Sequence, residues 1–351
     1  MKAIIAMSGG VDSSVAAYFM KKNGYECIGA TMKLYDNEDI GISREKTCCS
    51  LDDIDDARAV AHRLGMPYYV FNFKDEFERK VIDKFIRTYE QGGTPNPCID
   101  CNRYLKFEKL HHRMRELGYD YVVTGHYADI EEKDGRYFLK KGVDPGKDQS
   151  YVLYSLTQEQ LAHTLFPLGK YTKEQIREIA EREGFVNAKK RDSQDICFVP
   201  DGDYAAFIER HTGRTYPAGD FIDTKGDFIA HHSGIIHYTI GQRKGLGVAV
   251  GHPVYVVSKD VEQNTVTLGG NHDLMCKSLV AEDFNWICEK PSGEISCKAK
   301  TRYNMREVPC FAHCDGERVI VTFPTPVRAV TAGQAVVLYD GDYVLGGGTI
   351  V

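Results

Sequence analysis

The sequence predicts an α/β protein in which a parallel-sheet domain is followed by a small central domain and a C-terminal β-barrel. Three observations lead to this prediction. Residues 2–124 alternate short apolar runs with segments of helical periodicity. After about residue 197 the pattern changes to short alternating runs separated by turn signals. The length of 351 residues is also that of two or three domains.

The first half of the chain alternates strands with helices. Strands are predicted at residues 2–7, 25–34, 68–73 and 121–124, and helices at residues 13–23, 52–64, 75–89 and 103–117. Val15, Phe19 and Met20 give the first helix its apolar face, and Gly24 ends it. Such alternation indicates a parallel sheet covered on both faces. Ligands of such sheets bind at the carboxyl ends of the strands.

The second half is expected to be mostly β structure. Short apolar runs occur at residues 254–257, 319–323 and 335–339, and Gly- and Asp-rich segments separate them. The changes in pattern place the boundaries near residues 205 and 280. We therefore expect three domains, at residues 1–204, 205–280 and 281–351.

Composition limits the location and the partners of the chain. The chain is 42% hydrophobic, and its apolar runs are shorter than a signal peptide or a membrane span requires. We therefore expect a cytoplasmic protein with no membrane partner. The formal net charge of −6 argues against general affinity for nucleic acid, but local basic groups can still contact phosphates. Candidate groups lie at residues 140–147, 189–191, 243–244 and 302–306.

A glycine-containing loop follows the first predicted strand and opens a helix. Residues 6–14 read Ala-Met-Ser-Gly-Gly-Val-Asp-Ser-Ser. Two glycines allow backbone N–H groups to face an anion, and a helix N-terminus adds positive potential. Asp12 is a candidate ligand for Mg²⁺ bridging the phosphates. The Walker A lysine and the third glycine of the Rossmann fingerprint are both missing, so a different phosphate-binding loop is indicated.

Three of the eleven cysteines are candidates for chemistry. Cys98 and Cys101 form a Cys-x-x-Cys pair at the start of a predicted helix, where the helix N-terminus is expected to depress a thiol pKa. A thiolate there is a candidate nucleophile or iron ligand, and half of a structural zinc site is the alternative. Cys197 lies in residues 192–198, where a loop could return to the phosphate site.

The combination of strings resembles the tRNA-specific 2-thiouridylase family, within the ATP-pyrophosphatase superfamily. The string at residues 8–13 is similar to the pyrophosphate-binding loop of that superfamily, which cleaves ATP to AMP and pyrophosphate. Eight strings match in order over nearly the whole chain, at residues 7–13, 94–102, 124–127, 147–151, 165–169, 192–198, 238–243 and 339–348.

The resemblance implies a set of site residues. ATP contacts are implied at Ala6, Met7, Ser8, Gly9, Gly10, Val11, Asp12, Ser13, Met32 and Gly125. Contact with the target base is implied at Asn96, Pro97 and Cys98. Contacts with tRNA are implied at His126, Lys147, Asp148, Gln149, Arg302, Tyr303 and Gln334. Cys101 is implied as the nucleophile and Cys197 as the persulfide carrier.

The implied reaction adenylates the carbon-2 oxygen of the tRNA wobble uridine and then replaces it with sulfur. A cysteine desulfurase or a sulfur-relay protein would supply the sulfur, and a transient Cys101–Cys197 disulfide would result. Many family members have Asp at the position of Cys98. A third thiol favours a [4Fe–4S] cluster held by Cys98, Cys101 and Cys197 over a two-cysteine relay.

Two other functions use parts of the same pattern. An amidotransferase acting on a small molecule needs the loop at residues 8–13 but none of the three cysteines. A non-catalytic, zinc-dependent RNA-binding protein accounts for the cysteines and the barrel but leaves the loop unexplained.

Overall fold

The structure is a computed structural model that describes residues 1–36, 51–190 and 196–351. The chain divides into two compact units. The first unit comprises Met1–Val81, Cys98–Gly202 and Asp340–Leu345, and the second comprises Ile82–Pro97, Asp203–Tyr339 and Gly346–Val351. Residues 82–97, which we expected in a continuous catalytic domain, therefore group with the later part of the chain.

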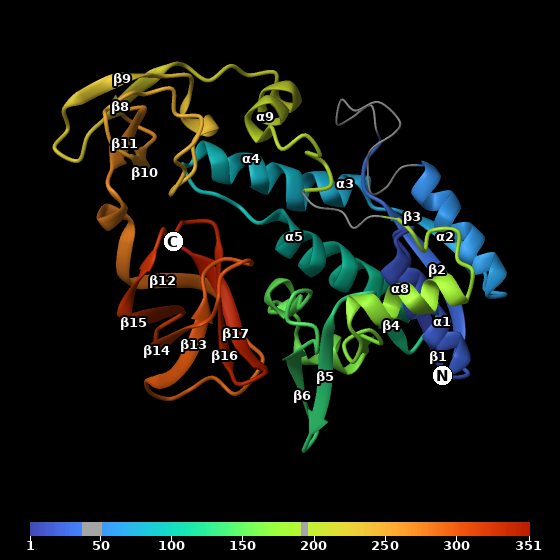
Figure 1. Ribbon diagram of the computed structural model, residues 1–351. Helices are drawn as coiled ribbons and strands as arrows, with labels where there is room; N and C mark the ends of the chain where they lie inside the picture. The colour runs from blue at the N-terminus through green and yellow to red at the C-terminus, as the bar shows by residue number, and fades with distance from the viewer. Residues whose placement is uncertain (37–50, 191–195) are drawn as a thin grey trace. The chain divides into compact units, whose positions relative to one another are not determined.

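A five-stranded parallel sheet forms the centre of the first unit (Figure 1). Its order is β3-β2-β1-β4-β7, and Ile4 of the central strand pairs with Ile28 on one side and Val122 on the other. The strands are β1 (Lys2–Ala6), β2 (Glu26–Lys33), β3 (Tyr68–Asn72), β4 (Tyr121–Val123) and β7 (Thr164–Leu165). The prediction of a parallel sheet is confirmed, and the carboxyl ends of β1 and β4 meet at one edge.

Helices cover both faces of this sheet. The core on one face combines Ala3 and Ile5 with buried side chains of α1 (Val11–Lys22), α2 (Leu51–Arg63) and α8 (Lys173–Arg182). On the other face, Ile4 packs with Leu110 and Met114 of α6 (Leu110–Glu116). Successive residues of a strand point to opposite faces. Alternate apolar side chains of β1 therefore pack in the two cores.

Two predicted helices are built differently from our expectation. The helix expected at residues 75–89 consists of α3 (Lys74–Phe77), a π-helical turn (Glu78–Ile82) and α4 (Asp83–Glu90). The helix expected to start at residue 103 starts six residues earlier, with α5 (Pro97–Asp100), a π-helical stretch (Cys101–Lys109) and α6. Proline is favoured in the first turn because its missing N–H has no intrahelical partner there.

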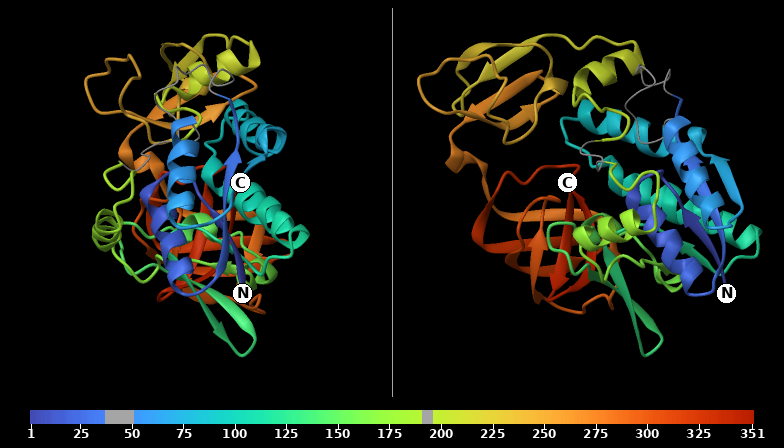
Figure 2. Two further views of the ribbon diagram at one scale, coloured as in Figure 1. Left: turned by 90° about the vertical axis from the view of Figure 1, so that its right-hand side faces the viewer. Right: turned by 45° about the vertical axis from the view of Figure 1, so that its right-hand side comes forward.

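The chain between β4 and α8 contains elements for which no sequence pattern was recognised. β5 (Ala128–Lys133) and β6 (Arg136–Lys141) form an antiparallel ribbon (Figure 2), and a 3₁₀ turn (Ser150–Leu153) and α7 (Gln158–Ala162) follow. Tyr343 pairs with Lys140 of this ribbon. The ammonium of Lys140 and the hydroxyl of Tyr343 donate to Glu131, and these contacts lower the pKa of that carboxyl to about 2.

The second unit contains two sheets. The smaller, ordered β10-β11-β8-β9, consists of β8 (Gly219–Ile222), β9 (Phe228–His232), β10 (Tyr255–Asp260) and β11 (Thr265–Gly269). The larger follows the order β12-β15-β14-β13-β16-β17 and closes into a barrel by pairing β12 with β17. Its strands are β12 (Met275–Trp286), β13 (Ile295–Lys300), β14 (Val308–Asp315), β15 (Arg318–Arg328), β16 (Ala335–Asp340) and β17 (Tyr343–Ile350). The predicted C-terminal barrel is confirmed.

Helix α4 packs on α9 (Tyr204–Thr212) within the second unit. The ring of Phe85 meets those of Tyr204 and Phe207 edge-on, at centroid distances of 6.0 and 6.1 Å. Glu90 accepts hydrogen bonds from Arg214 (2.9 Å) and Tyr216 (2.6 Å). These contacts explain why residues 82–97 group with the second unit. Among the described residues, no helix is both long and apolar enough to cross a membrane.

Leu110→Ala tests the core beneath the sheet. Leu110 is completely buried, so we expect the free energy of unfolding to fall by about 2–5 kcal/mol. Leu117→Ala is the matched control because Leu117 is 48% exposed, and its loss should cost less than about 0.5 kcal/mol. Urea unfolding followed by circular dichroism measures both. Equal shifts in the two variants would contradict the packing described here.

Candidate nucleotide and sulfur-transfer site

The predicted phosphate loop connects β1 to α1. Gly10 precedes the first turn of α1, and its carbonyl accepts hydrogen bonds from the Ser13 and Ser14 hydroxyls, at 3.0 and 3.1 Å. The backbone N–H of Ser8 donates to the Ser13 hydroxyl (3.2 Å). Ser8 is exposed and Gly10 is half-buried. The loop is thus internally bonded and lies at a helix N-terminus, where an anion is favoured.

Neighbouring elements hold the loop tightly. Gly9 has φ +75°, and a Cβ there would lie 2.4 Å from the carbonyl oxygen of Asp53. Asn187, which is buried, donates its side-chain amide to the Gly9 carbonyl (2.8 Å) and to the Ser14 hydroxyl (2.9 Å). Thr31 donates to the Met7 carbonyl (2.6 Å). Only glycine fits at position 9, because of both its backbone conformation and this close approach.

Asp12 is engaged by side chains of its own unit. The Lys173 ammonium lies 2.7 and 2.8 Å from the two carboxylate oxygens, and the Tyr127 hydroxyl donates to one of them at 2.7 Å. The Lys173 side chain is only 10% exposed. Both oxygens thus accept hydrogen bonds from a cation of the protein itself, and the expectation that Asp12 holds Mg²⁺ stays a prediction.

Lys173 is a site residue that sequence reasoning missed. It is the first residue of α8, where Thr172 and Gln175 form a capping box that fixes the start of the helix. Its backbone N–H donates to Asp144 (3.0 Å). The capping box could have been found in the sequence, but the pairing with a residue 161 positions away could not.

Gly125, expected at the adenosine, lies against the start of α1. A Cβ on Gly125 would be 2.8 Å from the backbone nitrogen of Ser13. The adjacent His126 is buried, and its ring contacts Phe107 and Phe166. Burial holds the pKa of this histidine well below its usual value. His126 is therefore a neutral interior side chain in this conformation, and its expected contact with tRNA stays a prediction.

Cys98 and Cys101 lie one turn apart on a continuous helix. Cys98 is exposed, and Cys101 is half-buried at the start of the π-helical stretch. Burial raises the pKa of the Cys101 thiol to about 11. Lys106 opposes this rise, and Cys98 and Asp100 add to it. The expected depression of the pKa by the helix N-terminus is wrong for this conformation, because desolvation outweighs the helix field.

Cys197 belongs to the first unit, as do Cys98 and Cys101. The Tyr35 hydroxyl donates to its carbonyl (3.1 Å), and the ring of Phe198 packs edge-on against Phe77. Residues 192–195 of the string that contains it lie outside the described residues. Within the part of the chain that the structure describes, no three His, Cys, Asp or Glu side chains are arranged to hold a metal ion.

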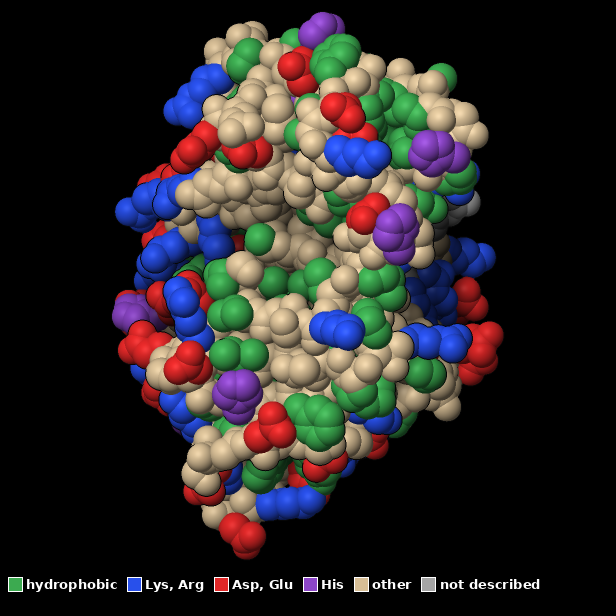
Figure 3. All heavy atoms as spheres, turned by 90° about the vertical axis from the view of Figure 1, so that its left-hand side faces the viewer, with side chains coloured by type: hydrophobic (Ala, Val, Ile, Leu, Met, Phe, Trp, Pro, Cys, Tyr) green, Lys and Arg blue, Asp and Glu red, His purple; other side chains and the backbone are tan. Residues whose placement is uncertain are grey.

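Several residues expected to contact tRNA have structural hydrogen bonds. Asp148 accepts from the backbone of Gly142 (3.1 Å), and Gln149 accepts from the backbone of Tyr127 (3.0 Å). Arg302 donates to two backbone carbonyls and to the Thr331 hydroxyl in the second unit. Lys147 and Tyr303 are half-buried. Figure 3 shows a face on which basic and acidic side chains interleave.

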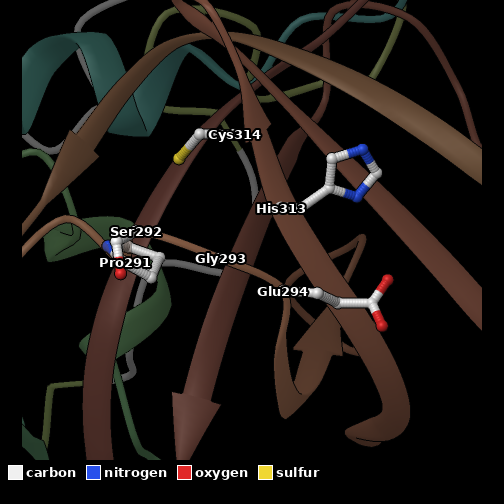
Figure 4. A pocket seen from close by; sticks show the side chains of 6 residues that line it. All are labelled: Pro291, Ser292, Gly293, Glu294, His313 and Cys314. Carbon is white, nitrogen blue, oxygen red and sulfur yellow. The ribbon is translucent and has the colours of Figure 1, made fainter.

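A pocket in the barrel carries a cysteine and a histidine but does not pair them. It is lined by residues 291–294 together with His313 and Cys314. The two side chains point apart (Figure 4), as consecutive residues of a strand do. They cannot act together as a nucleophile and its base, so we place the site in the first unit.

The fold and the loop define a nucleotide-binding α/β domain followed by two β domains, and comparison with known proteins identifies the family. The tRNA methyl transferase HUP domain matches residues 1–201, the tRNA methyl transferase PRC-barrel domain residues 205–270, and the aminomethyltransferase beta-barrel domain residues 276–350. The chain is 50% identical to a tRNA-specific 2-thiouridylase of Clostridioides difficile, over 99% of this chain and 98% of that one. It is 52% identical to the corresponding protein of Acetivibrio thermocellus, over 99% of both chains.

Solved structures match less closely. The U34-tRNA thiolase NcsA from Methanococcus maripaludis with its [4Fe–4S] cluster aligns at 19% identity and a TM-score of 0.37, over 61% of this chain and 68% of that chain. The full-length matches show that the chain belongs to the tRNA-specific 2-thiouridylase family.

Asp12→Asn should destabilise the first unit. The substitution removes the carboxylate charge beside the nearly buried Lys173 ammonium, and we expect a loss of about 1.5–3 kcal/mol. Lys173→Met should cost a similar amount, and the double variant should cost less than the sum of the two. Denaturant unfolding of the three variants measures this coupling. Strictly additive losses would show that the ion pair contributes nothing.

Alkylation of Cys101 should report its raised pKa. With a neutral reagent and a Cys98→Ser background, the rate should rise about tenfold per pH unit between pH 8 and 10, because only the thiolate reacts. Lys106→Gln should slow the reaction further, since Lys106 lowers this pKa. Lys109→Gln is the control, because Lys109 pairs with Glu76 (2.8 Å). A rate that stops rising below pH 8 would contradict the buried, protonated thiol.

Proposed function

We propose that this chain is an ATP-dependent tRNA-uridine 2-sulfurtransferase. It adenylates the carbon-2 oxygen of the wobble uridine and replaces it with sulfur, giving 2-thiouridine, AMP and pyrophosphate. The main support is one combination: a phosphate loop and a Cys98–Cys101 helix within one unit of a full-length member of the tRNA-specific 2-thiouridylase family. ATP as the activating nucleotide agrees with that loop.

In the first step the flipped-out uridine oxygen attacks the α-phosphate of ATP, and pyrophosphate leaves. The backbone N–H groups of residues 9–13 and the N-terminus of α1 stabilise the charge that develops on the pyrophosphate. Lys173 neutralises Asp12, so the loop does not repel the phosphates. Asp12, whose oxygens accept hydrogen bonds from Lys173, stays the candidate ligand for Mg²⁺, which would neutralise phosphate charge; no step is assigned to that ion.

In the second step a persulfide on Cys197 delivers sulfur. Its terminal sulfur attacks carbon-2, and AMP departs with the former carbonyl oxygen. The thiolate of Cys101 then attacks the sulfur of Cys197 and breaks the S–S bond. This releases the base as a thiocarbonyl and leaves a Cys101–Cys197 disulfide. A thiol reductant then reduces the disulfide and restores both cysteines. Lys106 is the cation that favours the Cys101 thiolate.

We choose this relay over a [4Fe–4S] cluster. Cys98, Cys101 and Cys197 are all described, and among the described residues no three such side chains are arranged to hold a metal ion. The relay needs a persulfide donor, which we propose is a cysteine desulfurase or a sulfur-relay protein. Because the thiols must stay reduced between turnovers, we place the reaction in the cytoplasm.

The test is nucleoside mass spectrometry of tRNA incubated with ATP and a persulfide donor. Cys101→Ser and Cys197→Ser should each lower 2-thiouridine formation by at least about 100-fold, because each removes an atom of the relay. Cys98→Ser is the matched control and should keep most of the activity.

Iron analysis after anaerobic reconstitution separates the two sulfur mechanisms. Loss of both iron and activity in Cys98→Ser would overturn the relay in favour of a cluster. Activity that survives in Cys101→Ser on a small-molecule substrate with ammonia would instead indicate an amidotransferase.

A further inference from the structure

The loop that precedes Cys98 is held by a turn of the second unit. The backbone N–H of Thr94 donates to the carbonyl of Ala332 (2.9 Å). The side-chain amide nitrogen of Gln334 donates to the carbonyls of Thr94 (2.9 Å) and Pro95 (3.2 Å). Loop and turn both belong to the second unit, so these contacts lie within one compact body.

The turn at residues 331–334 is itself fixed to the end of the barrel. The backbone N–H of Gly333 donates to the carbonyl of Ile350 (2.9 Å), and the N–H of Ile350 donates to the carbonyl of Gln334 (2.8 Å). A third backbone bond joins Gln334 to Thr331 (3.2 Å). Gln334 therefore projects from a rigid support.

The loop before Cys98 and the turn at residues 331–334 pack closely at two glycines. Gly333 has φ +87°, and a Cβ there would lie 2.6 Å from a methyl group of Thr88 and 3.1 Å from the carbonyl of Thr94. A Cβ on Gly93 would lie 2.8 Å from the same methyl group and 3.0 Å from the carbonyl of Ala332. Such close packing leaves little freedom for the loop to shift relative to the barrel.

We propose that Gln334 is a positioning residue for sulfur transfer and that it acts through this loop. Its two amide protons are donated to consecutive carbonyls, which fixes the loop just before Asn96, Pro97 and Cys98. Pro95 and Pro97 restrict the backbone between this contact and Cys98, because proline fixes its own φ angle. The inference rests on the proposed function and replaces the expected contact of Gln334 with tRNA.

Gln334→Glu tests the proposal. The substitution keeps the shape but removes both donors and places a carboxylate against two carbonyls. We expect 2-thiouridine formation to fall between about 10- and 100-fold, as for a displaced reacting group. Affinity for tRNA should stay within about twofold of that of the Gln91→Glu control, which adds the same charge at an exposed position nearby. Hydrogen exchange at residues 91–97 should accelerate in Gln334→Glu only.

The pH dependence separates positioning from a general structural defect. A protonated glutamic acid regains one donor, so the activity of Gln334→Glu relative to wild type should recover as the pH falls from 8 to 6. Gln334→Ala should show no such recovery. Wild-type activity and unchanged exchange in Gln334→Glu would overturn the inference, as would a loss of tRNA affinity equal to the loss of activity with unchanged exchange. If wild type forms no 2-thiouridine, the proposed function fails, while exchange still decides whether Gln334 holds the loop.

Discussion

The ion pair between Lys173 and Asp12 is the interaction on which the nucleotide site depends. It joins the first turn of α1 to the first residue of α8, two helices that cover the same face of the sheet. The side chain of Lys173 is only 10% exposed, and burying its ammonium is unfavourable unless an opposite charge is close. The Asp12 carboxylate supplies that charge. Because the pair leaves no net charge, the backbone amides of the loop determine the local potential. An anion therefore meets positive potential despite a carboxylate in the loop.

At Cys101, burial affects the thiol pKa more than the nearby positive charge does. Cys101 lies near a helix start and near Lys106, and both favour a thiolate. Burial outweighs them and keeps the thiol protonated, with a pKa of about 11. A protonated thiol resists oxidation and adventitious alkylation. Under the proposed relay, Cys101 reacts only once the Cys197 sulfur is bonded to the substrate. The low nucleophilicity of the resting thiol therefore protects the site between turnovers.

Local pattern was enough to predict the sheet and the phosphate loop, because both depend on residues close in sequence. The run at residues 2–7 was recognised as a buried strand, and the loop after it was recognised by its two glycines. Lys173 and Asn187 escaped recognition, since their roles depend on partners more than 150 residues away. The helix of Cys98 begins six residues before the expected start at residue 103, because Pro97 lies in its first turn, where proline is favoured.

The hydrogen bonds of Arg302 and Gln334 change how the barrel is understood. Both side chains donate to carbonyls of the second unit, and the contacts with tRNA that the resemblance implies for them stay predictions. Arg302 joins the backbone at Ile240, in the string at residues 238–243, to the backbone at Ala329. Gln334 joins the barrel to the loop before Cys98. Under the proposed positioning role of Gln334, a family signature marks a residue that shapes the binding surface from beneath, and the barrel acts on the reaction by holding the loop that leads to Cys98.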